Sequence, residues 1–409
     1  MVTAYRPVLL MTSKSFRFNL WLLLPILLIG AGIRDGFFVN FFSEIRWTYL
    51  VISLILFLNI WVRGLDNIFI HSSMAELCFS VFFLVLIFSN LIMGFSINTF
   101  ISNVVLVLLF LTAKSFVESR SYNFSLKKIH STLVYMGVFY IAFCYIFFDN
   151  YIVNVGVNIF YGPSGNAHNT GNLLALSVIF VCTSFDFKQN YKVFTLFQII
   201  LVLLGFYLMI MTHSRSSFLI ITIFVFLNII TSKNLLRNIV ITGGVLIFFS
   251  FCIFFFTLNS EAFSTILEIF VRGVERGLSG RDEIALYMID MIFKDNATLY
   301  FGNGAGSISS LPETLSASDA GSFVVVLFEF GIFGLIFWIF LIFVCILGLM
   351  VKNKNYFKNE KSFFIICLSF ACNPSDSNLT AYSSINGFLT VFGLFVTGQR
   401  LLKNYWKVS

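Results

Sequence analysis

One polar segment, residues 259–320, carries the side chains best suited to chemistry. It holds four basic residues, Arg272, Arg276, Arg281 and Lys294, together with nearly half of the 19 acidic residues. Only 11% of the 409 residues are charged, so this concentration stands out from the rest of the chain. The segment therefore predicts chemistry or recognition rather than a simple connection between apolar runs.

Helical spacing of apolar residues predicts two amphipathic helices within this segment. The first covers 261–278 and is typical of a helix lying in a membrane interface, with Arg272 and Arg276 on its polar side. The second begins near Ser279, where Asp282 three positions later forms a capping box. Its apolar positions are Ile284, Met288, Met291 and Ile292.

Arg281 falls in the first turn of the second helix, where the macrodipole already presents positive charge. An anion there is favoured by about 0.3–1 kcal/mol, so a phosphate bound beside Arg281 would explain the arrangement. The alternative is that Asp282 and Glu283 neutralise Arg281 on a solvated surface. The anion site is the favoured interpretation.

A short polar link, 212–217, joins two apolar runs and contains His213 and Arg215 among hydroxyl residues. An arginine that must enter hydrocarbon costs about 2.5–3.5 kcal/mol, so Arg215 needs a partner. Snorkelling to lipid headgroups is one solution, and acting as a fixed phosphate ligand is the other. The polar residues around Arg215 favour the phosphate ligand, with His213 as a glycan contact.

A third polar segment, 149–170, has no Lys or Arg and is rich in Gly, Pro, Asn and His at its end. His168 and Asn169 offer hydrogen bonds suited to sugar hydroxyls. Capping of the following helix by Asn169 or Thr170 explains the same residues equally well. Both interpretations stay open.

Two features close the segment 259–320. The glycine-rich stretch 301–306 lacks the lysine and the preceding strand of a nucleotide-binding loop, so it predicts a flexible turn. Asp319 precedes the next apolar run, where it is either the N-cap of a helix or a general base at the rim of a cavity.

The elements that must position these residues are membrane helices. The chain is 58% hydrophobic with 55 Phe, and its apolar runs near twenty residues long are typical of polytopic membrane proteins. These runs lack the alternation of a barrel strand, so they predict helices, which satisfy their own backbone. We expect an all-α fold with about twelve transmembrane helices: 18–33, 48–62, 76–94, 100–117, 129–148, 171–185, 193–211, 216–231, 238–258, 321–350, 362–381 and 384–401.

The distribution of positive charge orients these spans. With both termini cytoplasmic, 19 of the 26 Lys and Arg residues lie on the inner side, so the net charge of +7 reflects topology rather than nucleic-acid binding. Residues 259–320 then form one large periplasmic loop within a single integral-membrane domain, 1–409. The seven cysteines lie in or beside apolar runs without a metal-binding pattern, and we expect no metal and no cofactor.

Five short motifs follow one another along the chain in a characteristic order. They are the glycine-rich turn with Asn169, Ser-Arg-Ser at 214–216, Ser-Gly-Arg at 279–281, Gly-Asn-Gly-Ala-Gly at 302–306, and Glu-Phe-Gly-Ile-Phe-Gly at 329–334. In this order and spacing they resemble the O-antigen polymerase (Wzy) and O-antigen ligase superfamily. The resemblance covers the C-terminal two thirds of the chain by motif and the remainder by span count.

The resemblance implies substrates that are glycans carried on polyprenyl diphosphate and transferred at the outer face without a nucleotide sugar or a required metal. By position, Arg215 and Arg281 would grip the donor diphosphate, and Arg272 and Arg276 would hold a second diphosphate or lipid headgroups. The ligase branch has a His-Asn pair after the large loop, where this chain has Asp319 and no histidine. The polymerase branch is therefore preferred.

The resulting hypothesis is an O-antigen or capsule polymerase in the bacterial inner membrane. It would transfer a glycan chain from undecaprenyl diphosphate to the non-reducing end of a lipid-linked repeat unit, with Asp319 or His168 accepting the proton. Its partners would be membrane lipids, a chain-length regulator and a flippase. The alternatives are a flippase or transporter of the same lipid-linked oligosaccharide, and an O-antigen ligase. A transporter usually shows two related halves and charges near the middle of its spans, which this sequence lacks.

Overall fold

The computed structural model describes part of the 409-residue chain. The described residues are 97–118, 122–154, 158–184, 192–231, 281–304, 307, 322–351, 358–373 and 385–405. Four predicted spans (18–33, 48–62, 76–94 and 238–258) and the first amphipathic segment lie outside them. The candidate site residues Arg272, Arg276 and Asp319 also lie outside.

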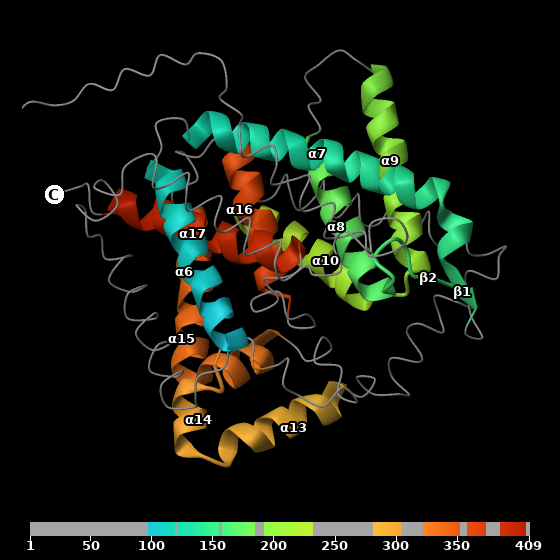
Figure 1. Ribbon diagram of the computed structural model, residues 1–409. Coiled ribbons are helices and arrows are strands. Elements are labelled where there is room, and N and C mark those ends of the chain that lie inside the picture. The colour runs from blue at the N-terminus through green and yellow to red at the C-terminus, as the bar shows by residue number, and fades with distance from the viewer. Residues whose placement is uncertain are drawn as a thin grey trace, which may run out of the picture.

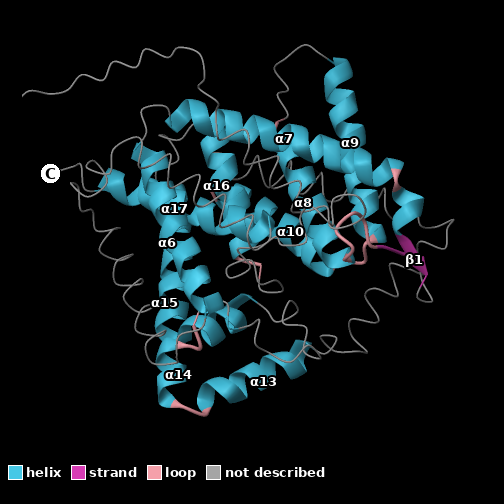
Figure 2. Cartoon of the chain, viewed as in Figure 1, coloured by secondary structure: helices cyan, strands magenta, loops and turns pink. Residues whose placement is uncertain are grey.

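The predicted all-α class is confirmed for the described residues, which are 86% helical (Figure 2). A 3-10 turn, Phe148–Tyr151, leads into a small hairpin in which β1 (Ile152–Asn154) pairs antiparallel with β2 (Asn158–Phe160). The helices are α6 (Ile97–Glu118), α7 (Tyr122–Ile146), α8 (Ala167–Thr183), α9 (Lys192–Met211), α10 (Arg215–Ile230), α13 (Arg281–Phe293), α14 (Asn296–Phe301), α15 (Ser322–Val351), α16 (Lys358–Ala371) and α17 (Ile385–Tyr405).

Each predicted span within the described residues coincides with a helix. Two of these helices contain stretches long and apolar enough to cross a membrane, Leu126–Ile146 in α7 and Phe323–Met350 in α15. Several boundaries differ from expectation by four residues or more. Helices α7, α8 and α16 begin seven, four and four residues before the predicted 129, 171 and 362. Helix α16 ends ten residues before the predicted 381, and α17 ends four residues after the predicted 401. The total of about twelve spans stays a prediction.

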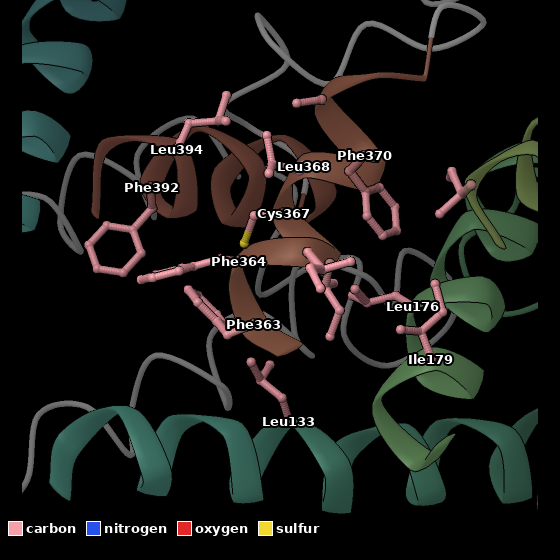
Figure 3. Close-up of a cluster of buried hydrophobic side chains, with 14 of the residues drawn as sticks. Leu133, Leu176, Ile179, Phe363, Phe364, Cys367, Leu368, Phe370, Phe392 and Leu394 are labelled. Atoms are coloured by element: carbon pink, nitrogen blue, oxygen red, sulfur yellow. The ribbon is translucent and has the colours of Figure 1, made fainter. Parts of the chain in front are cut away.

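Helix α8 lies at the centre of the described helices, and α7, α9, α10 and α16 all pack against it (Figure 1). Every residue of α8 from Thr170 to Val181 is buried. Helix α16 continues the core towards α17, which in turn packs against α6 and α15. Figure 3 shows this junction, where Phe363 and Phe364 of α16 lie between Leu133 of α7 and Phe392 of α17.

The outer face of α15 is an exposed apolar stripe. Its residues are 41–58% exposed although they are large hydrophobic side chains, and they recur three, four or seven residues apart, which places them on one side of the helix. Such a surface along a helix of membrane-spanning length is suited to contact with lipid tails. The stripe consists of Phe333, Ile336, Phe340, Phe343, Leu347 and Met350.

Helix α15 is broken at Gly331, whose backbone takes φ 65 and ψ −168. The break releases two carbonyl groups, and the chain that follows α14 satisfies both of them. The Phe328 carbonyl accepts the Asn303 backbone N–H at 2.8 Å and the Asn303 side-chain amide at 3.2 Å, and the Glu329 carbonyl accepts the Gly304 N–H at 2.9 Å. The glycine-rich stretch predicted to be a flexible turn is therefore a docked segment at residues 302–304.

The second amphipathic helix is confirmed as α13. Ile284, Met288 and Ile292 are buried against Val325 and Phe328 of α15, as the apolar spacing predicted. From the sequence, this helix is also expected to continue as far as the glycine-rich stretch 301–306, and that expectation is wrong.

The second amphipathic helix instead ends at Phe293, and α14 begins at Asn296 with a cap of its own. The Asp295 side chain accepts the Ala297 backbone N–H at 3.3 Å. Aspartate favours this capping position, which explains the interruption.

The two ends of α10 carry different chemistry. Lys361 donates to the Thr231 carbonyl at 2.5 Å, and beside it Arg400 pairs with the buried Glu360 at 3.2 Å. A lysine at a helix C-terminus complements the macrodipole. Arg215 begins the same helix at its other end, about 24 Å away for sixteen residues at 1.5 Å each. Lys361 and Arg400 therefore lie at the opposite end of α10 from Arg215, and the predicted membrane orientation of these residues stays a prediction.

Candidate functional site

The candidate site begins at the N-terminus of α8, which a tight loop presents to the turn between α9 and α10. Thr170 holds this loop, since its hydroxyl donates to the Tyr161 carbonyl at 2.5 Å and lies 2.6 Å from the Ser164 hydroxyl. The helix cap is Asn166. Its side-chain oxygen accepts the backbone N–H of His168 at 2.8 Å and the backbone N–H of Asn169 at 3.3 Å. The predicted caps, Asn169 and Thr170, are therefore wrong by three or four residues. Asn169 is exposed in the first turn instead.

A polar network joins α8 to the 212–217 link. The His168 Nδ1 atom lies 3.2 Å from the Ser214 hydroxyl and 3.1 Å from the Ser216 hydroxyl. Asn172, fully buried one turn further along α8, accepts hydrogen bonds from Ser216 at 2.8 Å and from Ser217 at 3.3 Å. Buried polar groups are costly unless they are hydrogen-bonded, so this network fixes how the two segments meet.

Gly171 makes this close approach between α8 and the link sterically feasible. A Cβ atom at this position would lie 2.4 Å from the Ser217 hydroxyl oxygen, 2.6 Å from Ser214 Cβ and 2.8 Å from the Thr212 hydroxyl oxygen. None of these distances is compatible with a real side chain in the present packing. The absence of a side chain at Gly171 therefore decides the width of the site.

We expect Gly171→Ala to push the 212–217 link away from α8, destabilise the protein by about 1–3 kcal/mol through overpacking, and lower activity per folded molecule. Gly205→Ala in α9 is the matched control. Its Cβ would lie 2.5 Å from Val178, which is in α8 like Gly171 but away from the polar network. Both variants should lower the Tm of the detergent-solubilised protein. Only Gly171→Ala should also lower activity, and equal activities would contradict a role for the network.

Arg215 is the first residue of α10 and its side chain is exposed. No acidic residue lies in the first turn of α10, and within the described residues Arg215 forms no ion pair. The N-cap residue, Ser214, makes no side-chain hydrogen bond to the backbone N–H groups of the first turn. Its hydroxyl instead lies 3.1 Å from the Ser216 hydroxyl and accepts from the Ser217 hydroxyl at 2.8 Å. The helix dipole and the guanidinium group therefore present positive potential at one point, which is the arrangement that binds anions.

His213 precedes this helix in an unusual conformation. Its φ of 53° is in the left-handed region, which a residue other than glycine rarely adopts, and its backbone N–H donates to the Ile210 carbonyl at 3.0 Å. The turn at His213 reverses the chain sharply enough for α10 to start against α8. The imidazole that contacts the serines is that of His168.

The described residues bring together part of the site expected from sequence. His168 meets the link that carries Arg215, and Asn169 lies in the same turn as His168. Arg281 is the first residue of α13 and so lies in its first turn, as predicted. That Arg281 and Arg215 bind one phosphate group together stays a prediction. Asp319, Arg272 and Arg276 lie outside the described residues.

Sequence reasoning missed the role of Asn172 and of the serine hydroxyls that contact it. The signal was present, since Asn172 follows His168 by four residues and shares its helix face. That face is polar at the start of an otherwise apolar helix. The polar stripe could have been matched with the serines of 212–217.

The chemistry available at the site is that of donors and cations. It combines hydroxyl groups, an imidazole, a guanidinium group and the first-turn amides of α10, all suited to phosphate oxygens or sugar hydroxyls. Within the described ranges no group of three or more His, Cys, Asp or Glu side chains is placed to hold a metal ion. The described side chains are therefore chemically suited to an anion or to hydroxyl groups.

Comparison with known proteins adds no family assignment. No protein-family model matches the chain, and no curated protein matches it at a significant level.

Proposed function

We propose that this protein is a membrane glycosyltransferase that polymerises oligosaccharide repeat units of O-antigen or capsule. It transfers a glycan chain from an undecaprenyl diphosphate donor to the non-reducing end of a lipid-linked repeat unit. The observation that carries this proposal is Arg215, an exposed cation at the start of α10 beside the His168 network. A diphosphate is the anion that such a site would meet at the end of a membrane helix.

The reaction places modest demands on the protein. An acceptor hydroxyl attacks the anomeric carbon of the donor, the bond from that carbon to the diphosphate oxygen breaks, and the diphosphate leaves with the electron pair. Cations that bind the leaving group more tightly as charge develops lower the barrier. Arg215 has this role, with Arg281 as its partner from the large loop and with Arg272 and Arg276 near a second diphosphate or the headgroups. His168 or Asp319 accepts the proton from the acceptor hydroxyl.

The proposed location is the bacterial inner membrane, with both termini cytoplasmic and the site facing the periplasm. Three observations support it: the two helices of spanning length, the exposed apolar stripe of α15, and the separation of Lys361 and Arg400 from Arg215. The basic residues of the inner segments set this orientation. A flippase that delivers repeat units and a chain-length regulator are the proposed partners.

A flippase for the same lipid-linked oligosaccharide is the second candidate, and one observation favours it. Helix α15 is discontinuous at Gly331 with Glu329 fully buried beside the break, and broken helices with buried charges are common at transporter sites. The break is filled by the 302–304 segment, which gives it a structural role of its own. The polymerase explains Arg215 and His168 as well, so it is preferred.

The test compares bacteria with and without this chain. Loss of a polymerase leaves single repeat units on the lipid carrier at the outer leaflet, and surface polysaccharide of one unit's length. Loss of a flippase traps the same units at the inner leaflet, and loss of a ligase leaves long chains on the lipid carrier. Gel profiles of surface polysaccharide together with the leaflet location of lipid-linked units separate the three. Long polymer in the absence of the chain would contradict the proposal.

A further inference from the structure

Helix α13 carries two apolar stripes, and one of them is exposed. The stripe that packs against α15 consists of Ile284, Met288 and Ile292. The other stripe consists of Leu286, Ile289 and Phe293, which are three, four or seven residues apart and therefore share one side of the helix. Leu286 is 60% exposed and Phe293 is 67% exposed. An exposed apolar stripe on a helix whose opposite side is already packed marks a surface for contact with something else.

The next side of this helix is polar. Tyr287 and Lys294 follow Leu286 and Phe293 by one residue each, which places them about 100° further around the helix axis. Asp290 lies between these two lines, and both Asp290 and Lys294 are exposed. The α13 segment therefore has one side for protein, one for an apolar environment and one for water. A helix that lies in a membrane interface has this division between apolar and polar sides.

The adjoining helix, α15, indicates where a bilayer would end. Every residue from Phe323 to Gly331 is buried or half-buried, whereas exposed large hydrophobic side chains begin at Phe333 and continue to Met350. The stretch 333–350 is about 27 Å long at 1.5 Å per residue, close to the roughly 30 Å of a hydrocarbon core. In the sequence Lys352 follows two residues later, and basic residues are typical of the end of a membrane span. The break at Gly331 therefore coincides with one edge of the lipid-facing stretch.

The α13–α14 unit meets the lipid-facing stretch at this edge. Tyr300 of α14 is 47% exposed, and its ring centroid lies 5.9 Å from that of Phe333, which is 46% exposed. The exposed apolar surface of α15 thus continues onto α14 through Tyr300. Tyrosine is enriched at membrane interfaces, where its ring is in an apolar environment and its hydroxyl is hydrated. Figure 1 shows α13 crossing this end of α15 instead of running along it, as a helix parallel to a membrane surface would.

We propose that the α13–α14 unit docks on the lipid bilayer, with Leu286, Ile289 and Phe293 inserted into the membrane interface and Tyr300 at the edge of the hydrocarbon. Lipid is the occupant because the exposed surface continues one that has the length and composition of a membrane span. The docking requires a membrane but not the polymerase reaction. Arg281 begins α13, so docking would hold it at the level of the lipid headgroups. If the proposed function is right, the diphosphate of the substrate lies at that level.

Photocrosslinking tests this docking in the full-length protein, in nanodiscs of phosphatidylethanolamine and phosphatidylglycerol. Benzoylphenylalanine in place of Phe293 should give at least about fivefold more lipid adduct than the same group in place of Tyr287, because only the first position is on the apolar side. Tyr287 is the matched control, since it is an exposed aromatic residue of the same helix. Attachment of position 293 to another segment of this chain or to a second copy would overturn the proposal. Equal lipid yields at the two positions would also overturn it.

Depth-dependent quenching gives a second readout with a fluorescent amino acid at the same position. A nitroxide near the lipid headgroup should quench position 293 at least about twofold more than one near the end of the acyl chain, because an interfacial helix enters only about 5–10 Å. The order should reverse at position 343, which is about 15 Å along α15 from Phe333 and in the middle of the exposed stripe. Quenching of position 293 by neither lipid would place α13 away from the membrane and overturn the docking. Both readouts need no substrate, so a protein that makes no polymer would overturn the proposed function while leaving the docking to be decided by them.

Discussion

Arg215→Ala should abolish long polymer and lower kcat by about a hundredfold or more, because losing one preorganised stabiliser of developing charge typically has that effect. The side chain is exposed and forms no ion pair within the described residues, so its removal leaves no buried charge behind. The measurement is the length distribution of polymer formed by purified protein from the lipid-linked repeat unit.

The same variant should be at least as stable as the parent. A cation in the first turn opposes the helix dipole by about 0.3–1 kcal/mol, and alanine removes that conflict. Loss of activity with an unchanged or higher Tm is the signature of a residue kept for function. Arg215→Lys should recover part of the rate, since a lysine retains the charge but not the bidentate geometry.

Lys294→Ala provides the control for Arg215. Lys294 is also an exposed cation, directly after α13 in the large loop, and it has no assigned role in binding. Its removal tests whether any exposed positive charge outside the proposed site matters for the rate. If Lys294→Ala lowers the rate as much as Arg215→Ala, the rate depends on general electrostatic attraction of the negatively charged lipid substrate. That result would contradict a specific diphosphate site at Arg215.

Periodicity in the sequence predicted those elements whose packing follows from their own residues. The apolar spacing of Ile284, Met288 and Ile292 identifies the buried face of α13, because one face of a helix must cover apolar surface wherever the helix lies. The boundaries of α9 and α15 were predicted within one or two residues for the same reason. Hydrophobic runs in these regions are uninterrupted, so burial and helix formation agree.

Capping positions were harder to predict because several residues in one loop could serve. The stretch 166–170 offers Asn166, Asn169 and Thr170, and each has a side chain able to cap a helix. The loop geometry decides between them. Thr170 is occupied by the Tyr161 carbonyl, which leaves the cap to Asn166 and moves the helix start to Ala167.

Arg215 could be identified from the sequence because a charged side chain next to apolar residues is energetically costly. Its immediate sequence neighbours are enough to show that it needs a partner. The approach of His168 to the Ser214 and Ser216 hydroxyls, by contrast, joins residues 46 and 48 positions apart. No local pattern encodes such a contact, which depends on the sharp turn at His213 and on the missing side chain at Gly171.

The docked 302–304 segment escaped prediction for a related physical reason. A glycine-rich sequence is compatible with flexibility and equally with close approach of two backbones, and only the partner distinguishes these. Here the partner is the broken α15, with Gly302 and Gly331 facing each other. The break and the docked segment therefore stabilise each other, and together they hold the α13–α14 unit, which begins at Arg281, against α15.

Gly331→Ala should be among the most destabilising substitutions in the described residues, with an expected loss of about 2–6 kcal/mol. The backbone at φ 65 and ψ −168 is in a region that is essentially restricted to glycine, which accounts for about 1–3 kcal/mol. The remainder is steric, because the new Cβ would lie 2.4 Å from the carbonyl carbon and oxygen of Tyr300, and overpacking against backbone costs about 1–3 kcal/mol. The measurement is the Tm of the detergent-solubilised protein.

Two further variants separate the causes of this loss. Gly165→Ala also places a side chain at positive φ, at +63°, but on an exposed loop, and should cost only about 1–2 kcal/mol. Gly302→Ala should match Gly331→Ala, because its Cβ would lie 2.4 Å from the Glu329 carbonyl. If Gly302→Ala were as mild as Gly165→Ala, the two segments would not be docked. Equal large losses would establish that α15 is held in its broken form by the loop that carries Arg281.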